Sequence, residues 1–196
     1  MSPRPYSLGK RRETIDQGRQ HVLDAARSLL AAPDGSAFTV DAVARRADVA
    51  RATVYYQFGS KAGLLEAVCD HLADLGGLGG LAEAFTEPDP HRGLWRFVGC
   101  FGRFWAADRA ATRRLRALAA LEPDVGAVIA ARDQRRHDGL AVLVGRLPDP
   151  PADAGRVIRA LAALTSFEMF DALAGPDQDL TAVISDVLRL ADAALH

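Results

Sequence analysis

Apolar side chains recur every three or four residues along most of the chain, which is the spacing of one face of an α-helix. The alternation of apolar and polar residues that would indicate strands does not occur. The pattern therefore predicts an all-α fold. The helices that we expect cover about residues 15–32, 40–47, 51–58, 60–75, 91–107, 110–121, 123–147, 152–173 and 180–195.

The segment from Thr39 to Leu65 predicts two short helices joined by a tight turn and followed by a third helix. Thr39 is placed to cap the first helix, because threonine is a preferred N-cap residue. Asp48 occupies the turn, and aspartate is one of the few residues besides glycine that tolerates a left-handed backbone. The apolar face of the first helix consists of Val40, Val43, Ala44 and Ala47.

The second short helix is expected to have an apolar inner side and a polar outer side. We expect Val49, Ala52 and Val54 to point inward, and Arg51, Thr53 and Tyr55 to point outward. Side chains at the start of a recognition helix reach base edges in helix-turn-helix proteins, so the pattern predicts DNA binding. Lys61 follows the expected cap Ser60, where an ammonium and free backbone N–H groups suit a phosphate. The alternative is a plain packing motif with Tyr55, Tyr56 and Phe58 as core aromatics.

The motif Ala-x-x-Ala-x-Val, followed by Arg-Ala-Thr-Val-Tyr-Tyr-x-Phe-x-Ser-Lys-x-x-Leu, resembles the N-terminal domain of the tetracycline-repressor (TetR) family. The resemblance extends from about Ile15 to Val68. It implies that Thr39 and Lys61 contact phosphates. It also implies that the recognition helix presents Arg51, Ala52, Thr53, Tyr55 and Tyr56. Arg51 is the candidate for reading a guanine, a contact that discriminates by about 1–3 kcal/mol.

Four positions depart from the family pattern. Ala50 stands where a capping residue is common, so the recognition helix lacks a cap that contributes about 1 kcal/mol. Asp48 replaces the usual turn glycine, Gln57 replaces a common histidine, and Ala62 replaces a common acidic residue. These departures bear on affinity and sequence preference rather than on the fold.

The charge distribution agrees with DNA binding at the amino end, although the net charge of the 196 residues is −1. Residues 1–61 contain ten Lys/Arg against six Asp/Glu, and residues 62–196 contain 14 against 19. A basic end on an acidic body is typical of a localised nucleic-acid contact. Arg4, Lys10, Arg11 and Arg12 are predicted to precede the first helix, either as a DNA-binding arm or as a solvated tail.

The chain is predicted to contain a DNA-binding domain at 1–61 and a helical effector-binding and dimerisation domain at 62–196. The glycine-rich tract Gly76–Gly80 interrupts the fourth helix, because each interior glycine costs a helix about 1 kcal/mol relative to alanine. We expect this tract to be a hinge. Replacing Gly76 and Gly77 by Ala is accordingly expected to change the effector response more than the fold.

The family resemblance implies that the last two helices, 152–173 and 180–195, pair with their copies in a homodimer that binds a palindromic operator. The alternative is that both helices only close the core of one subunit. The resemblance also implies a small-molecule pocket among the middle helices and a repressor that its effector releases from DNA. The candidate pocket residues are His71, Trp95, Cys100, Phe101, Phe104, Trp105, Phe167 and Phe170.

Other classes of function receive less support from the sequence. His71, His137, Glu122, Glu168 and Asp171 could supply acid–base chemistry, but no catalytic, phosphate-binding or metal-binding motif surrounds them. We therefore expect no enzyme and no cofactor, with a small helical enzyme or a helical protein-interaction module as the alternatives. Cys69 and Cys100 lack metal-site spacing, and a redox switch between them is the alternative to two buried thiols. No signal peptide or membrane-length apolar run occurs, which favours a cytoplasmic protein.

Overall fold

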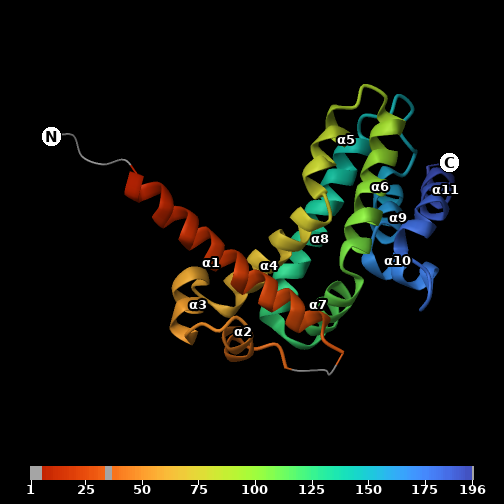
Figure 1. The fold of residues 1–196 in the computed structure, drawn as a ribbon. Coiled ribbons are helices and arrows are strands. Elements are labelled where there is room, and N and C mark those ends of the chain that lie inside the picture. Colours follow the sequence, from red (N-terminus) through yellow and green to blue (C-terminus); the bar gives the residue numbers. More distant parts are fainter. Residues whose placement is uncertain (1–5, 34–36, 196) are drawn as a thin grey trace. The chain divides into compact units, whose positions relative to one another are not determined.

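The computed structural model describes residues 6–33 and 37–195, and it places helices but no strands in these ranges. The predicted all-α fold is thereby confirmed. The chain divides into two compact units, Met1–His71 and Leu72–His196. The boundary that we predicted after residue 61 coincides with the start of a helix that crosses from one unit into the other. The first unit contains α1 (Tyr6–Ala31), α2 (Val40–Arg46), α3 (Arg51–Phe58) and most of α4 (Lys61–Leu75) (Figure 1).

The first unit is built around one apolar core to which all four helices contribute. Its most deeply buried side chains are Val22, Ala26, Val43, Val54, Leu64, Leu65 and Val68. One prediction about α1 is wrong. The helix begins at Tyr6, so positions 10–12 belong to it and do not form a preceding tail. Ile15, on the same helix, is 54% exposed. Arg4 lies outside the residues that the structure describes.

The central helix of the second unit is α6 (Pro90–Ala107), and its buried side chains contribute to a large core. These side chains are Leu94, Phe97, Val98, Phe101 and Trp105. Pro90 opens this helix, and the Asp89 carboxylate caps it by accepting hydrogen bonds from the backbone N–H groups of His91 and Arg92. The surrounding elements are a 3₁₀ turn (Leu78–Leu81), α5 (Ala82–Thr86), α7 (Arg109–Leu121), α8 (Pro123–Val144), α9 (Ala154–Leu164), α10 (Phe167–Ala174), a second 3₁₀ turn (Leu180–Val183) and α11 (Ile184–Ala194).

The long helix predicted over 152–173 is wrong, because the chain breaks between α9 and α10 at Thr165 and Ser166. The backbone carbonyl of Thr165 accepts a hydrogen bond of 3.0 Å from Trp105 Nε1, and its hydroxyl accepts one of 2.8 Å from Arg136 Nη1. Ser166 then caps α10 by accepting from the N–H of Met169. The segment is apolar on several sides because it consists of two helices, each with its own buried face.

A group of ion pairs joins α7 to α10 within the second unit. Arg109 Nε and Arg113 Nη2 both lie 2.6 Å from Asp171 Oδ1, and Arg116 Nε lies 2.6 Å from Glu168 Oε1. Burial alone would raise the pKa of the Asp171 carboxyl, but the hydrogen bonds from Arg113 and Arg109 bring it below its ordinary value. The pKa of Glu168 is lowered in the same way, with Arg116 outweighing burial.

Acidification is expected to weaken the second unit through these two carboxylates. Because their pKa values are lower in the folded than in the unfolded chain, their stabilising contribution is complete above about pH 5 and is lost as the pH falls below about 4. We expect urea unfolding, followed by the fluorescence of Trp95 and Trp105, to show this loss. Asp171→Asn should reduce the part of the free energy of unfolding that is lost on acidification by up to about 1 kcal/mol, the scale of a partly exposed ion pair. The control, Asp149→Asn, removes an exposed carboxylate from the loop after α8. An acid dependence that Asp171→Asn leaves unchanged would contradict the assignment.

The packing of the glycine tract corrects the expectation that Gly76 and Gly77 can be replaced without affecting the fold. A Cβ atom on Gly76 would lie 2.7 Å from the Cα of Phe104, which is too close for van der Waals contact, and Gly77 has a left-handed φ of 71°. By contrast, a Cβ on Gly79 or Gly80 would meet no atom within 4 Å.

These surroundings predict opposite effects for neighbouring glycines. Gly76→Ala is expected to destabilise the second unit by about 1–3 kcal/mol, the scale of overpacking. Gly79→Ala and Gly80→Ala are expected to be neutral or to stabilise it by up to about 1 kcal/mol, because alanine restricts the unfolded chain. Urea unfolding of the three single variants tests this contrast. Similar stabilities for all three would show that the close approach of Gly76 to Phe104 has no energetic consequence.

Candidate nucleic-acid interface

The turn between α2 and α3 is formed by local interactions that the sequence predicts. The hydroxyl of Thr39 caps α2 by accepting a hydrogen bond of 3.1 Å from the N–H of Ala42, which confirms the predicted cap. Asp48 has a φ of 50°, which confirms the predicted left-handed turn, and the N–H of Val49 donates to the carbonyl of Ala44. The apolar face of α2 is buried as expected.

The helix α3 has one buried and one exposed side, so the alternative in which its aromatics form core holds for Phe58 but not for Tyr55 and Tyr56. Val54 and Phe58 are buried, whereas Tyr56 is 90% exposed and Tyr55 is 38% exposed. The inward orientation predicted for Ala52 is wrong. Ala52 lies about 200° around the helix from Val54, so burial of Val54 turns it to the exposed side.

Two further residues in this region, Thr53 and Val49, differ from their predicted orientations. Thr53, expected to point outward, is half-buried, because it lies only about 100° from Val54 and therefore at the edge of the buried face. Val49, expected to pack inward, is also half-buried. The exposed side of α3 is therefore formed by Arg51, Ala52, Tyr55 and Tyr56.

Arg51, at the first position of α3, lies across this exposed side. Its Nη1 donates to Asp41 Oδ2 at 3.3 Å, and its Nη2 donates to the hydroxyl of Tyr55 at 3.3 Å. The guanidinium carbon lies 5.3 Å from the centre of the Tyr55 ring. The hydrogen bond to Tyr55 and the charge of Asp41 raise the pKa of Arg51 above its ordinary value, so the side chain is cationic.

The two ends of α3 differ, because a side chain of α1 contacts the C-terminal end, whereas the N-terminal end lacks a side-chain cap. Ala50 provides no side-chain cap, which confirms the missing cap expected from the sequence. At the other end, Arg19 of α1 donates a hydrogen bond of 3.0 Å to the carbonyl of Gln57, and its guanidinium lies 4.3 Å from the centre of the Phe58 ring. A cation is favourable at a helix C-terminus, where carbonyl groups lack partners. These contacts fix the orientation of α3 on α1.

The start of α4 agrees with the predicted phosphate site. The Ser60 hydroxyl accepts a hydrogen bond of 3.0 Å from the N–H of Gly63, and Lys61 is the first residue of the helix. Gly59 has a φ of 75°, a left-handed conformation that suits glycine and ends α3 directly before this cap.

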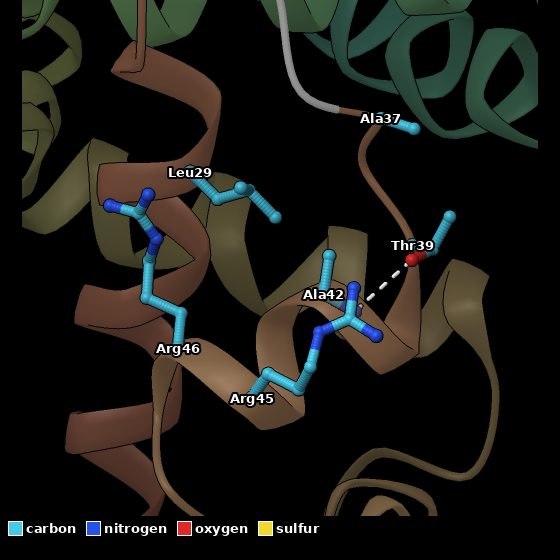
Figure 2. Close-up of a pocket in the computed structure, with 6 residues that line it drawn as sticks. All are labelled: Leu29, Ala37, Thr39, Ala42, Arg45 and Arg46. Atoms are coloured by element: carbon cyan, nitrogen blue, oxygen red, sulfur yellow. Dashed lines mark hydrogen bonds between the residues drawn. The ribbon is translucent and has the colours of Figure 1, made fainter. Parts of the chain in front are cut away.

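An open pocket beside α2 is lined by two arginine side chains, Arg45 and Arg46, that were not among the predicted site residues. Its lining is shown in Figure 2 and consists of Leu29, Ala37, Thr39, Ala42, Arg45 and Arg46. Both arginines are exposed, and Arg46 is oriented toward α1, where its Nη1 donates to the Ser28 hydroxyl at 2.8 Å. The sequence could have indicated these two residues, because they form a pair of arginines in the last turn of a short helix whose N-cap, Thr39, is a predicted phosphate contact.

Two of the candidate pocket residues, His71 and Trp95, are not part of the buried core of the second unit. His71 ends the first unit, where its Nε2 is 3.0 Å from Asp24 Oδ1 and its ring is within hydrogen-bonding distance of Gln20. Trp95 is 42% exposed, with its ring beside that of His91. Cys69 and Cys100 are both buried thiols that form no disulfide, and they belong to different units.

The remaining candidate pocket residues lie in the second unit. A continuous series of ring contacts connects Phe101, Phe104, Trp105 and Phe167, with centroid distances between 4.4 and 6.2 Å. Phe170 is fully buried, and Cys100 Sγ accepts a hydrogen bond from Arg103. The buried Arg136, which was not predicted, lies with its guanidinium carbon 5.8 Å from the centre of the Phe101 ring.

The acidic residues considered for acid–base chemistry have other partners in the structure. Glu168 and Asp171 are bound by the arginines of α7. Within residues 6–33 and 37–195, no group of three or more His, Cys, Asp and Glu side chains is arranged to hold a metal ion. In the same part of the chain, no helix combines the length and the apolar character that crossing a membrane requires.

Comparisons with known proteins agree with this geometry. Residues 22–68 match the family model for bacterial regulatory proteins of the tetR family. The HTH-type transcriptional regulator AlkX of Mycobacterium tuberculosis is 48% identical over 56 residues, which are 29% of this chain and only 26% of that relative.

Solved structures extend the likeness to both units. A TetR-like regulator from Rhodococcus sp. RHA1 has a TM-score of 0.67 and 26% identity, covering 91% of this chain and 95% of its own. A regulator from Saccharomonospora viridis, solved in complex with choline, shares the fold with a TM-score of 0.65 at 16% identity, covering 90% and 96% of the two chains. From the helix-turn-helix geometry and these matches, we conclude that residues 22–68 form a DNA-binding domain of the tetR family of bacterial regulatory proteins, and that the whole chain has the fold of TetR-like regulators.

Proposed function

We propose that this DNA-binding transcriptional regulator is a repressor that binds a palindromic operator as a homodimer and leaves it when a small molecule binds. The observation that carries the DNA-binding part is the exposed side of α3. A helix anchored by Val54 and Phe58 presents on its other side Tyr56, at 90% exposure, and a cationic Arg51 that contacts Tyr55. Large aromatic and cationic side chains held outward on a rigid helix are suited to base edges and phosphates.

The proposed contacts divide into base reading and phosphate binding. Arg51, at the start of α3, reads a guanine, while Ala52, Thr53, Tyr55 and Tyr56 lie on or beside the helix surface that enters the major groove. Thr39 and Lys61 bind phosphates on either side of that groove. Arg45 adds a cation next to Thr39, and we include it among the phosphate contacts.

A homodimer is proposed because a two-fold protein matches a palindromic site. The surface that we assign to it lies on the final helices, which expose Leu173 on α10 and Leu190 on α11. The opposite side of α11, with Val187 and Ala191, is buried in the core of its own unit. Sedimentation of the free chain should give twice the subunit mass, and Leu190→Arg should shift it toward the single subunit. A wild-type chain that sediments as one subunit would refute the dimer.

The effector is proposed to bind in the second unit and to favour a conformation that does not fit the operator. The aromatic residues Phe101, Phe104, Trp105 and Phe167 supply the apolar contacts that small-molecule sites need. The choline complex of the S. viridis regulator is a precedent for a small organic molecule bound to a protein of this fold.

Selection of bound duplexes from a random pool tests the proposed function. The expected result is enrichment of one sequence with two inverted half-sites. Failure to enrich any sequence, together with retention of an unrelated protein, would instead support a helical protein-interaction module. Titration over a salt series adds a second criterion, because phosphate contacts make the affinity fall steeply with salt.

Lys61→Ala is expected to weaken binding to selected and random duplexes by a similar factor, because a phosphate contact carries no base information. The slope of log K against log salt should fall by about one for each lost contact. The matched control is Arg92→Ala, which removes an exposed cation from the second unit. If Lys61→Ala changed the preferred sequence without changing the salt slope, the phosphate role would be wrong.

A further inference from the structure

The carboxylate of Asp41 is the acidic partner of the residue proposed to read DNA. Its two oxygens lie 3.3 Å from Nε and 3.3 Å from Nη1 of Arg51, and Nη2 of Arg51 contacts the Tyr55 hydroxyl. The guanidinium is thus held at one side by a carboxylate and at the other by a phenol. Asp41 is 49% exposed and Arg51 is 60% exposed, so the pair lies on the solvent side of the helix-turn-helix.

The fold of the helix-turn-helix creates this pair from residues ten positions apart. Asp41 is in the first turn of α2, where its charge is favourable to the helix dipole. Arg51 begins α3, where the dipole disfavours a cation and where Ala50 provides no capping side chain. The left-handed turn at Asp48 brings the two helix starts together. Asp41 therefore supplies the negative charge that the start of α3 lacks.

The ion pair of Asp41 and Arg51 affects binding to the preferred sequence and binding to random DNA differently. A long arginine side chain that is already held in place loses less conformational freedom when it meets a base. At the same time, a carboxylate on a surface that faces phosphates repels them and lowers affinity for any sequence. The first effect raises the preference for the sequence that Arg51 reads, and the second lowers the affinity for random DNA.

We propose that Asp41 is a positioning residue that sets the base preference of Arg51 and suppresses binding to random DNA. The proposal rests on the proposed function, because it presupposes that α3 reads a duplex. Asp41 acts through Arg51 and does not itself contact a base. Its removal should therefore relax preference only at the base pair that Arg51 reads.

Three variants separate this role from general effects of charge and folding. Asp41→Asn removes the charge at nearly constant shape, and Asp41→Glu restores the carboxylate on a longer side chain. The matched control is Asp48→Asn, which removes an exposed carboxylate from the same unit and places asparagine, which also tolerates a left-handed backbone, in the turn. Thermal unfolding of each variant verifies that the helix-turn-helix remains folded.

The binding experiment uses the duplex selected by the wild-type chain, the same duplex changed at the Arg51-dependent base pair, and a random duplex. For Asp41→Asn we expect preference at that base pair to fall about tenfold, within the range of one bidentate contact, and affinity for random DNA to rise. Asp41→Glu should keep most of the preference, and Asp48→Asn should keep all of it. Unchanged preference in Asp41→Asn would overturn the inference, as would a changed preference at a neighbouring base pair, which would mean that Asp41 reads a base itself.

The outcomes also distinguish this inference from the proposed function. If the wild-type chain selects no duplex, the proposed function fails and the role of Asp41 fails with it. If the wild-type chain selects a duplex and Asp41→Asn behaves like Asp48→Asn, only the role of Asp41 is refuted. Nitrogen-15 relaxation of the Arg51 Nε–H group in the free protein is an independent readout. We expect that group to become more mobile in Asp41→Asn and to remain unchanged in Asp48→Asn, and equal mobility in all three proteins would refute the restraint.

Discussion

Replacing Arg51 by Ala is expected to lower affinity for the selected duplex by about 5- to 150-fold, which corresponds to about 1–3 kcal/mol, while binding to random DNA changes little. The reason is that a guanidinium can donate two parallel hydrogen bonds to O6 and N7 of guanine, and no other base presents this pair of acceptors in the major groove. The position of Arg51 at the start of the exposed side of α3 makes such a contact accessible. The measurement is a titration of both duplexes at one fixed salt concentration.

Arg45→Ala is the appropriate comparison for Arg51→Ala, because it removes an exposed arginine from the same helix-turn-helix without touching α3. It should weaken binding to both duplexes similarly, as expected for a phosphate contact. If Arg51→Ala also weakened both equally, Arg51 would be a phosphate contact and the base reading would have to come from Tyr55, Tyr56 or Thr53.

Phe170→Ala is expected to destabilise the second unit by about 3–5 kcal/mol, the range for truncating a buried phenylalanine. Phe170 is 0% exposed, and a Cβ added to Gly102 would lie 2.9 Å from its ring, so the ring fills the space next to α6 closely. The lost contacts and the cavity that remains both raise the free energy of the folded state. Because Trp95 and Trp105 are the two tryptophans of the chain, their fluorescence during urea unfolding reports on this unit.

The matched control for Phe170→Ala is Leu121→Ala, at the end of α7, where the side chain is 79% exposed. We expect it to change the free energy of unfolding by less than about 1 kcal/mol, because little apolar surface returns to water. A Phe170→Ala variant as stable as Leu121→Ala would show that α10 is not an integral part of the core.

The helix-turn-helix could be predicted from sequence in most of its details. The cap at Thr39, the left-handed turn at Asp48 and the missing cap at Ala50 all depend on contacts within a few residues. Such contacts can be inferred from residue type and spacing alone, because the backbone geometry of a helix end or a turn is nearly the same in every protein. The inward prediction for Ala52 was wrong because the spacing of apolar residues in so short a helix does not define its buried side.

The second unit shows why sequence periodicity was insufficient further along the chain. The break at Thr165 is invisible in the apolar pattern, and the side chains that hydrogen-bond to Thr165 there, Trp105 and Arg136, are 60 and 29 residues away. Similarly, the clash predicted for an alanine at Gly76 depends on Phe104, which no local rule connects with it.

The amino-acid sequence alone was sufficient to identify an all-helical regulator and the segment with which it is proposed to bind DNA. The three-dimensional arrangement was needed to show that Tyr56 is exposed while Phe58 is buried, and that Asp41 forms an ion pair with Arg51. The physical reason is the range of the interactions. Caps, turns and helical periodicity act between near neighbours, whereas burial and ion pairing depend on which distant segments the fold brings together.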